Sequence, residues 1–419
     1  MPEADATRAL YVTRAPRPPW IDQRLGSTDG EGGRMSRGTS GEYWSEPELP
    51  SVFKHALLSR YMPKFGGMTG AYGRRVTYLD GYAGEGRYEN GEPGSAARIL
   101  QIAADLQAKA GIHWTCFFAE KSAPSFAQLG SLVAEYQARG VDARAFRGDV
   151  LGYFDEVLAA ATGQPLFLFL DPCGLALPFE RLVDVLAKGR PGPKPPTEFL
   201  LNFSMMAIRR IGGNSQSPKG IERTNQRLDE VCGGPWWRDF FAGGYTREAD
   251  EKVAAEYSAR LGKAVGMQMR SVPVTKAPGQ KAVYNLVFGT RRQHGLWAFG
   301  DAHARARDTW WQQLELHEEA TDDGLFPVVS LQRPDPQKVR DLAVPAMADN
   351  LARLLRRGRT IRLVDHTLEV FGEYYGQVTE TAARDAIKLL HRRGGTPSDG
   401  MSHQREKVYD LLVRPPLTR

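Results

Sequence analysis

A regular alternation of apolar runs and helical patterns between residues 75 and 204 constrains the fold more than any other feature of the chain. Each run is short enough for a single strand, and the segments between the runs have the apolar spacing of helices. The runs are RVTYLD (75–80), WTCFFAE (114–120), ARAFRGD (143–149), PLFLFLDP (165–172) and EFLLNFS (198–204). Continuous apolar strands that alternate with helices form parallel sheets covered on both faces, so we predict a doubly wound α/β domain.

Further elements are predicted on either side of this alternation. Before it, apolar residues at helical spacing run from Pro50 to about Phe65, with Lys54 and His55 on the other side of the helix. After it come a polar stretch with GGPWW (233–237), a helix, two strand patterns and a second helix. The two helices cover 249–264 and 304–320, and the two strands cover 267–275 and 282–290. GLWAFGD (295–301) is a candidate third strand at the far edge of a mixed sheet.

Composition divides the chain into three parts. Residues 1–45 are rich in Pro, Gly, Arg and Ser and show no periodicity, which predicts a disordered leader. Residues 46–325 hold the Rossmann-like domain. Residues 326–419 contain three helical patterns and a short strand pair around TPSDGMS (396–402), from which we predict a winged-helix-like α+β domain.

Composition also excludes several classes of protein. No stretch approaches the roughly 18 to 20 unbroken apolar residues of a membrane span, and the N-terminus lacks the pattern of a secretory signal. We therefore expect a cytoplasmic protein with no membrane partner. Cys116, Cys173 and Cys232 are far apart and form no CxxC pair, so we expect reduced thiols and neither a disulfide framework nor a metal site.

Acidic residues follow the predicted strands at the edge where a doubly wound sheet binds its ligands, outside the carboxyl ends of the strands. The residues in question are Asp80 with the loop Gly81, Tyr82, Ala83, Gly84 and Gly86; Glu120 with Lys121; Gly148 with Asp149; and Asp171 with Pro172. The fifth strand ends at Asn202, Phe203 and Ser204.

Each of these ends has a second interpretation when it is taken alone. The glycine loop lets a backbone with amide N–H groups approach a ligand, but a D-G dipeptide between apolar residues is also a hairpin sequence. Glu120 is placed to accept ribose hydroxyls and Asp149 to meet an adenine amino group, yet both positions suit helix caps. Together, the loop and the two acids favour S-adenosylmethionine over NAD, which would require a stricter glycine fingerprint.

The end of the fourth strand bears on the methyl acceptor. Proline at position 172 removes a backbone donor and fixes φ, so a neighbouring carbonyl is expected to point into the pocket beside the Asp171 carboxylate. A carboxylate and a carbonyl side by side accept both hydrogens of an exocyclic amine. The alternative is an acidic strand end followed by a turn.

The motifs KH…LDGYAGEGRYENGEPGSA…FFAEKS…GD…FLDPCG…LLNFS resemble the three-Cys-motif partner protein family. More distantly, the Lys54-His55 helix and the glycine block look like the adenine N6-methyltransferases of large-subunit ribosomal RNA, and the D-P-x-G end is similar to tRNA guanine N2-methyltransferases. The match covers about Pro50 to Trp310. It implies a Rossmann-like class I methyltransferase fold and S-adenosylmethionine as cofactor. It also implies a radical-S-adenosylmethionine-like three-Cys-motif protein as partner.

The resemblance also implies roles for single residues. Lys54 would contact the methionine carboxylate with His55 close by, and Asp80, Gly81, Gly84 and Gly86 would line the loop. From its place in the same stretch, Tyr88 is a candidate lid over the site. Asp171 would orient the acceptor or act as a general base for a hydroxyl. Cys173 stands where the family usually has an aromatic residue, which leaves base recognition open.

The acceptor expected from these patterns is an amine or hydroxyl, with a nucleobase in nucleic acid favoured over a small molecule. From residue 331 onward the chain carries 16 Lys and Arg against 11 Asp and Glu, which places much of the net charge of +6 in the predicted C-terminal domain. Trp236 and Trp237 are candidates to stack a flipped base, or else core residues. The arginines that would neutralise phosphates are Arg209, Arg210, Arg356, Arg357, Arg359, Arg392 and Arg393. A non-catalytic scaffold for the partner protein is the remaining alternative.

Overall fold

The structure is a computed structural model that describes residues 47–70, 73–175, 177–187, 195–213, 221–246, 248–321, 333–401 and 407–416. The predicted leader over residues 1–45 lies outside the described residues, as does most of the connection between residues 321 and 333. None of the described helices is both long enough and apolar enough to cross a membrane.

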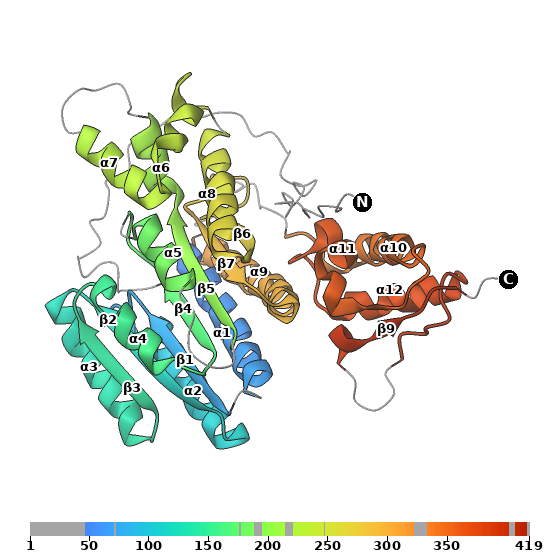
Figure 1. Cartoon of the computed structure of the whole chain (residues 1–419), viewed down its shortest axis with the longest axis horizontal. Coiled ribbons are helices and arrows are strands. Elements are labelled where there is room, and N and C mark those ends of the chain that lie inside the picture. Colours follow the sequence, from blue (N-terminus) through green and yellow to red (C-terminus); the bar gives the residue numbers. More distant parts are fainter. Residues whose placement is uncertain are drawn as a thin grey trace, which may run out of the picture.

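A seven-stranded sheet with the order β3-β2-β1-β4-β5-β7-β6 forms the centre of the larger part of the molecule (Figure 1). Strands β1 to β5 are parallel, and β7 runs antiparallel to both of its neighbours. The strands are β1 Arg75–Asp80, β2 His113–Glu120, β3 Asp142–Arg147, β4 Leu166–Leu170, β5 Thr197–Ser204, β6 Gln268–Val274 and β7 Tyr284–Thr290. This arrangement confirms the predicted doubly wound, Rossmann-like α/β domain.

Helices cover both faces of the sheet and form two separate apolar cores with it. The first core joins the sheet to α1 Leu49–Thr69, α2 Ser95–Ala110, α3 Ala123–Ala138 and α9 Gln293–Thr321. The second joins it to α4 Phe154–Ala160, α5 Phe179–Ala187, α6 Met205–Gly213, α7 Ile221–Cys232 and α8 Ala249–Val265. Apolar side chains of the central strands point alternately into the two cores, which is why these strands are apolar throughout.

Two predicted elements were wrong. GLWAFGD is the start of α9 and not a third edge strand, because Leu296, Phe299 and Ala302 follow helical spacing and pack against α1 and β7. The Phe299 ring stacks on that of Phe288 in β7, with 4.1 Å between the ring centroids. The stretch after Ser204, read only as polar, contains α6, α7 and the 3-10 helix η4 Pro235–Phe241.

The C-terminal part has its own apolar core, formed by three helices and the chain around them. Its elements are α10 Pro336–Leu355, β8 Ile361–Arg362, η5 Leu363–His366, α11 Thr367–Phe371, η6 Gly372–Tyr374, α12 Thr381–Arg392, η7 Val408–Asp410 and β9 Leu412–Val413. The strand pair joins β8 to β9, whereas the sequence placed it around 396–402. The winged-helix assignment stays a prediction.

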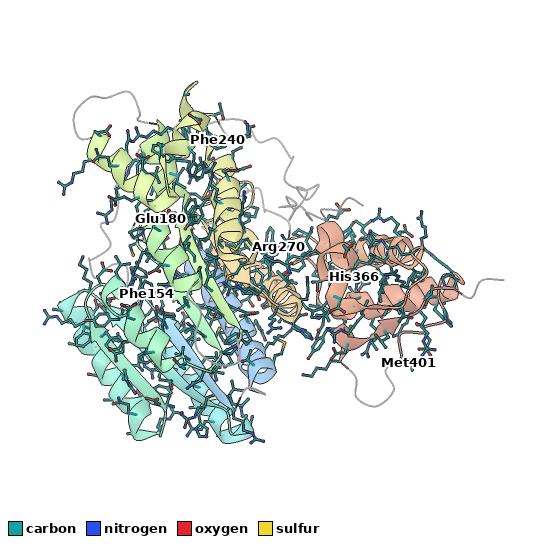
Figure 2. All side chains as sticks on the ribbon, in the orientation of Figure 1. Phe154, Glu180, Phe240, Arg270, His366 and Met401 are labelled. Carbon is teal, nitrogen blue, oxygen red and sulfur yellow. The ribbon has the colours of Figure 1, made fainter. Side chains whose placement is uncertain are left out.

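The C-terminal part packs on α9, as Figure 1 shows. Asp301 of α9 is buried, and its carboxylate accepts hydrogen bonds from Lys64 Nζ at 2.5 Å and from the Glu380 backbone N–H at 2.9 Å. The Tyr375 hydroxyl donates to the Leu296 carbonyl at 2.6 Å. Arg270, labelled in Figure 2 between the two parts, places its guanidinium 5.6 Å from the Tyr375 ring centroid.

Candidate active site at the carboxyl ends of the strands

The register of the parallel strands brings the predicted site residues to one edge of the sheet. Glu120 pairs with Arg147, two residues before Asp149, and Asp80 pairs with Phe169, two residues before Asp171. Neighbouring strands lie about 4.8 Å apart, so Asp149, Glu120, Asp80 and Asp171 follow one another across four strands. The strand order reverses between β1 and β4, which is where ligands bind in sheets of this kind.

The loop after β1 is held across three strands by its own backbone. The N–H of Gly81 donates to the Phe169 carbonyl at 2.9 Å, and that of Ala83 to the Ala119 carbonyl at 3.0 Å. The N–H groups of Tyr82 and Gly84 donate to the carboxylates of Asp80 and Glu120. These four N–H groups therefore have partners inside the protein and are not the ones that the loop would present to a ligand.

The glycines of this loop serve close approach of the backbone instead. Gly84 and Gly86 have φ values of 61° and 83°, a region that other residues avoid. A Cβ at Gly86 would lie 2.4 Å from Cδ2 of Leu132, so the position has no room for a side chain. Because β1 pairs in parallel with β2 and β4, the hairpin interpretation of Asp80-Gly81 is excluded.

Asp80 lies under the loop with no exposed surface. Its Oδ1 accepts the Tyr82 N–H at 3.1 Å, and its Oδ2 accepts the Ser95 hydroxyl at 2.7 Å at the start of α2. Burial raises the pKa of the Asp80 carboxyl to about 7, although both hydrogen bonds favour the ionised form. The residue therefore joins the loop to α2 and places a titratable group beneath it.

Glu120 and Asp149 both take part in the turns that follow their strands. Glu120 accepts the Gly84 N–H on Oε2 at 2.9 Å and the Ser122 N–H on Oε1 at 2.6 Å. Each carboxylate oxygen has a second lone pair, so these bonds leave Glu120 able to accept further donors. Asp149 is exposed and caps the 3-10 helix η3 Val150–Gly152 through a 3.1 Å bond from the Leu151 N–H.

The residues beside these two acids complete this end of the edge. The Gly148 N–H donates to the Glu120 carbonyl at 3.0 Å, and the φ of 151° at Gly148 is one that favours glycine. Lys121 is exposed. The backbone thus holds the ends of β2 and β3 together where ribose and adenine are expected.

Asp171 is the centre of a charged network that links three elements. Its Oδ2 forms an ion pair with Lys54 Nζ of α1, and its Oδ1 accepts from Asn202 Nδ2 of β5 at 2.6 Å. The side chains of Lys54 and Asp171 are only 6% and 15% exposed. Pro172 is buried, and its carbonyl accepts the Gly174 N–H at 2.9 Å in the turn that follows the strand.

Asn202 is the site residue to which sequence reasoning gave no role. An amide residue directly after the apolar run Phe199 to Leu201 of β5 was the available signal. Its amide is oriented by Asp171, because Oδ1 in place of Nδ2 would face a carboxylate oxygen. Its Oδ1 is buried and has no hydrogen-bond partner within the part of the chain that the structure describes.

His55 and two tyrosines add further buried polar atoms near this edge. His55 Nδ1, Tyr78 Oη and Tyr82 Oη have no hydrogen-bond partner among the described residues. The His55 ring lies edge-on to Tyr88, with 5.9 Å between the ring centroids. Burial, and then the charges of Lys54 and Arg98, hold the pKa of His55 well below its ordinary value, so the imidazole is neutral.

Several residues proposed for nucleic-acid binding have structural partners instead. Arg209 pairs with Asp250 at 2.8 Å, and Trp237 is buried in the second core with its N–H on Asp229. The Trp236 N–H donates to the Cys232 carbonyl at 2.9 Å. These contacts support the core interpretation of both tryptophans. Two surface cavities lie away from the strand ends, one between α9 and α10 and the other between α10 and α12.

Comparison with known proteins gives distant structural likenesses. No protein-family model matches the chain, and no curated protein matches it. The chain is similar to the methyltransferase domain of bacterial CtHen1-CN, with 11% identity and a TM-score of 0.29 over 56% of this chain and 99% of that one. It is also similar to the small RNA methyltransferase HEN1, with 12% identity and a TM-score of 0.33 over 63% of this chain and 28% of that one.

A third solved structure, YjhP from E. coli, shares 15% identity with a TM-score of 0.25 over 57% of this chain and 98% of that one. Similarities this weak carry no argument about function. The fold assignment rests on the strand order and pairing of the sheet itself. Membership of the three-Cys-motif partner family stays a prediction.

Proposed function

We propose that this protein is an S-adenosylmethionine-dependent methyltransferase acting on an amine or hydroxyl, with a nucleobase in nucleic acid as the favoured acceptor. The observation that carries the proposal is the row of Glu120, Asp80 and Asp171 on adjacent strands at the switch point of the sheet. A single acid at a strand end is often a cap. Three at the carboxyl ends of adjacent strands, beside a glycine loop, favour a bound ligand with several polar groups.

The residues present fit the proposed cofactor. Glu120 and Asp149 offer acceptors for ribose and adenine, and Lys54 offers a cation for a carboxylate. The buried polar atoms of His55 and Tyr82 without partners among the described residues are the groups that a polar ligand would satisfy. S-adenosylmethionine, when bound, would supply a methyl group activated by a sulfonium.

The acceptor would then lie beyond the ends of β4 and β5. Asp171 and Asn202 hold oxygen acceptors there, which suits a substrate that presents N–H or O–H groups. Positioning of this kind is the main contribution that the protein's own residues would make. Exposed arginines after α10 and at the end of α12 support a nucleic-acid substrate, namely Arg356, Arg357, Arg359 and Arg392.

Isothermal titration calorimetry with S-adenosylmethionine and S-adenosylhomocysteine tests the cofactor directly. We expect saturable binding with a dissociation constant in the micromolar range, and no heat of binding at millimolar ligand would contradict the proposal. Transfer of a labelled methyl group to total RNA, to DNA or to a small-molecule extract then identifies the acceptor class. If the label is found only in the small-molecule fraction, the methyl acceptor is a metabolite and not a nucleobase.

A further inference from the structure

Arg227 lies on the exposed side of α7 and is attached to the loop that follows β4. Its Nε donates to the Leu175 carbonyl at 2.8 Å, and Leu175 is four residues after Asp171. The positive charge of Arg227 lowers the pKa of Tyr82, whereas the negative charges of Asp149 and Asp171 raise it. The guanidinium therefore lies at the border of the candidate active site, although it comes from an element that the sequence analysis did not predict.

The anchoring bond leaves a defined part of the guanidinium for a ligand. Leu175 occupies only Nε, so each terminal nitrogen keeps an N–H at the far end of the guanidinium, and these two N–H groups are parallel. Such a pair matches two oxygens of a phosphate group. Leu175 thus orients Arg227 in advance and lowers the conformational entropy lost on binding.

Among the described residues no acid forms an ion pair with Arg227, although α7 also carries Glu222, Asp229 and Glu230. Within the described ranges, neither Arg227 nor Arg223, one helical turn earlier on α7, has an acidic partner, and both are exposed. Residues four apart on a helix point the same way, with about 6 Å between their Cβ atoms. Other exposed arginines of this domain, such as Arg87 and Arg260, form ion pairs with neighbouring acids.

We propose that Arg227, supported by Arg223, binds a phosphate of the methyl acceptor next to Asp171, so that the acceptor is a phosphate ester. This inference rests on the proposed function, whose active site it extends from the sheet edge onto α7. The phosphate belongs either to a nucleic-acid strand or to a free nucleotide. In both cases Arg227 holds the substrate while Asp171 and Asn202 face the reacting group.

The test uses the full chain, saturated with S-adenosylhomocysteine, and a fluorescein-labelled single-stranded RNA of mixed sequence. Fluorescence anisotropy at several salt concentrations should show that Arg227→Gln weakens binding about 5- to 10-fold and lowers the salt slope by about 0.7. Arg227→Lys should keep the salt dependence of binding and lose part of the affinity, since lysine supplies the charge but not two parallel N–H groups. Arg139→Gln, an exposed arginine at the end of α3, is the matched control and should change neither.

Competition by nucleoside monophosphates distinguishes the two sources of phosphate. If nucleoside monophosphates displace the labelled RNA as effectively as unlabelled RNA does, the site binds a free nucleotide. If they displace it much less effectively, the site binds a nucleic-acid strand. Equal affinity and slope for Arg227→Gln and the wild type, or no binding of either probe by the wild type, would overturn the inference. Calorimetry with S-adenosylmethionine is the separate measure of the proposed function, and every variant should bind it as the wild type does.

Discussion

The Asn202 side chain donates from Nδ2 to Oδ1 of Asp171 over 2.6 Å, across the ends of β5 and β4. Leu170 and Leu201 are paired in register immediately before these residues, so the two strands bring both side chains to the same level. Lys54 occupies the other oxygen of the carboxylate. Asp171 is thus held between the cation of Lys54 and the amide donor of Asn202. Substitutions at these two positions therefore test how its negative charge is stabilised.

Replacing Asn202 by Asp should make stability fall more steeply with pH than it does in the wild type. Two adjacent carboxylates cannot easily both ionise, so the pKa of one is raised in the folded state. The folded protein then holds a proton that the unfolded chain has lost, and the free energy of unfolding should fall by about 1 to 3 kcal/mol between pH 5 and pH 8. Urea unfolding at both pH values measures this fall. Asn202→Ala should lose similar stability relative to the wild type at the two pH values. A difference between Asn202→Asp and the wild type that is the same at both pH values would contradict the arrangement.

Removing the negative charge of Asp171 should destabilise the protein through Lys54. Asp171→Asn leaves the buried ammonium without its counter-charge, for an expected loss of about 2 to 4 kcal/mol in the free energy of unfolding. Adding Lys54→Met should recover part of that loss, because a hydrophobic side chain of similar length needs no partner. A double-mutant cycle from denaturant unfolding gives the coupling energy, and additive losses would show that the ion pair contributes nothing.

Asp80 should lower the stability of the ligand-free protein as the pH rises. Its pKa is raised from 3.8 to about 7 by burial, so between these values the folded state binds a proton that the unfolded state does not. The free energy of unfolding therefore falls across this window, by up to about 4 kcal/mol for a shift of this size. Asp80→Asn should remove this share and gain stability over the wild type at pH 8 but not at pH 4.

Glu198 has a raised pKa in the same range and contributes its own slope to the wild-type curve. The quantity to compare is therefore the difference between variant and wild type at each pH. If the difference in the free energy of unfolding between Asp80→Asn and the wild type is constant from pH 4 to pH 8, Asp80 does not cause the pH dependence.

Two glycines with the same φ separate backbone strain from lack of space. Gly86 and Gly91 both have φ of 83°, but a Cβ at Gly86 meets Leu132 at 2.4 Å whereas one at Gly91 meets nothing within 4 Å. Gly91→Ala should cost about 1 kcal/mol from strain alone, and Gly86→Ala about 1 to 3 kcal/mol more. Thermal unfolding compares the two variants. Equal losses would mean that Leu132 moves aside without cost.

Loss of Asp301 should weaken the attachment of the C-terminal part. This buried carboxylate accepts from Lys64, from Arg305 and from the Glu380 backbone, so Asp301→Ala should cost about 3 kcal/mol or more. We expect calorimetric unfolding to separate into two transitions. Arg305→Gln, which removes one half-exposed partner, should cost less than about 1 kcal/mol and keep a single transition.

Local patterns predicted most of the sheet because its central strands are buried on both faces. The bounds of β1 and the core of β4 follow directly from apolar runs that end at an acid. The start of α9 was missed because GLWAFGD is short and rich in aromatic residues, which suits a strand as well as a buried helix. Helix α6 was missed because it is only 9 residues long, and α7 because its apolar residues are few and separated by polar ones.

The sequence by itself determined that acids follow β1, β2 and β4, and that these ends share one edge, since parallel strands joined by helices all point the same way. Only the tertiary structure decided which groups meet there. The pairing of Lys54 with Asp171 joins residues 117 positions apart, and the internal use of the loop N–H groups depends on the strand order. Contacts over such separations arise from how the elements pack, and no local pattern of residues encodes them.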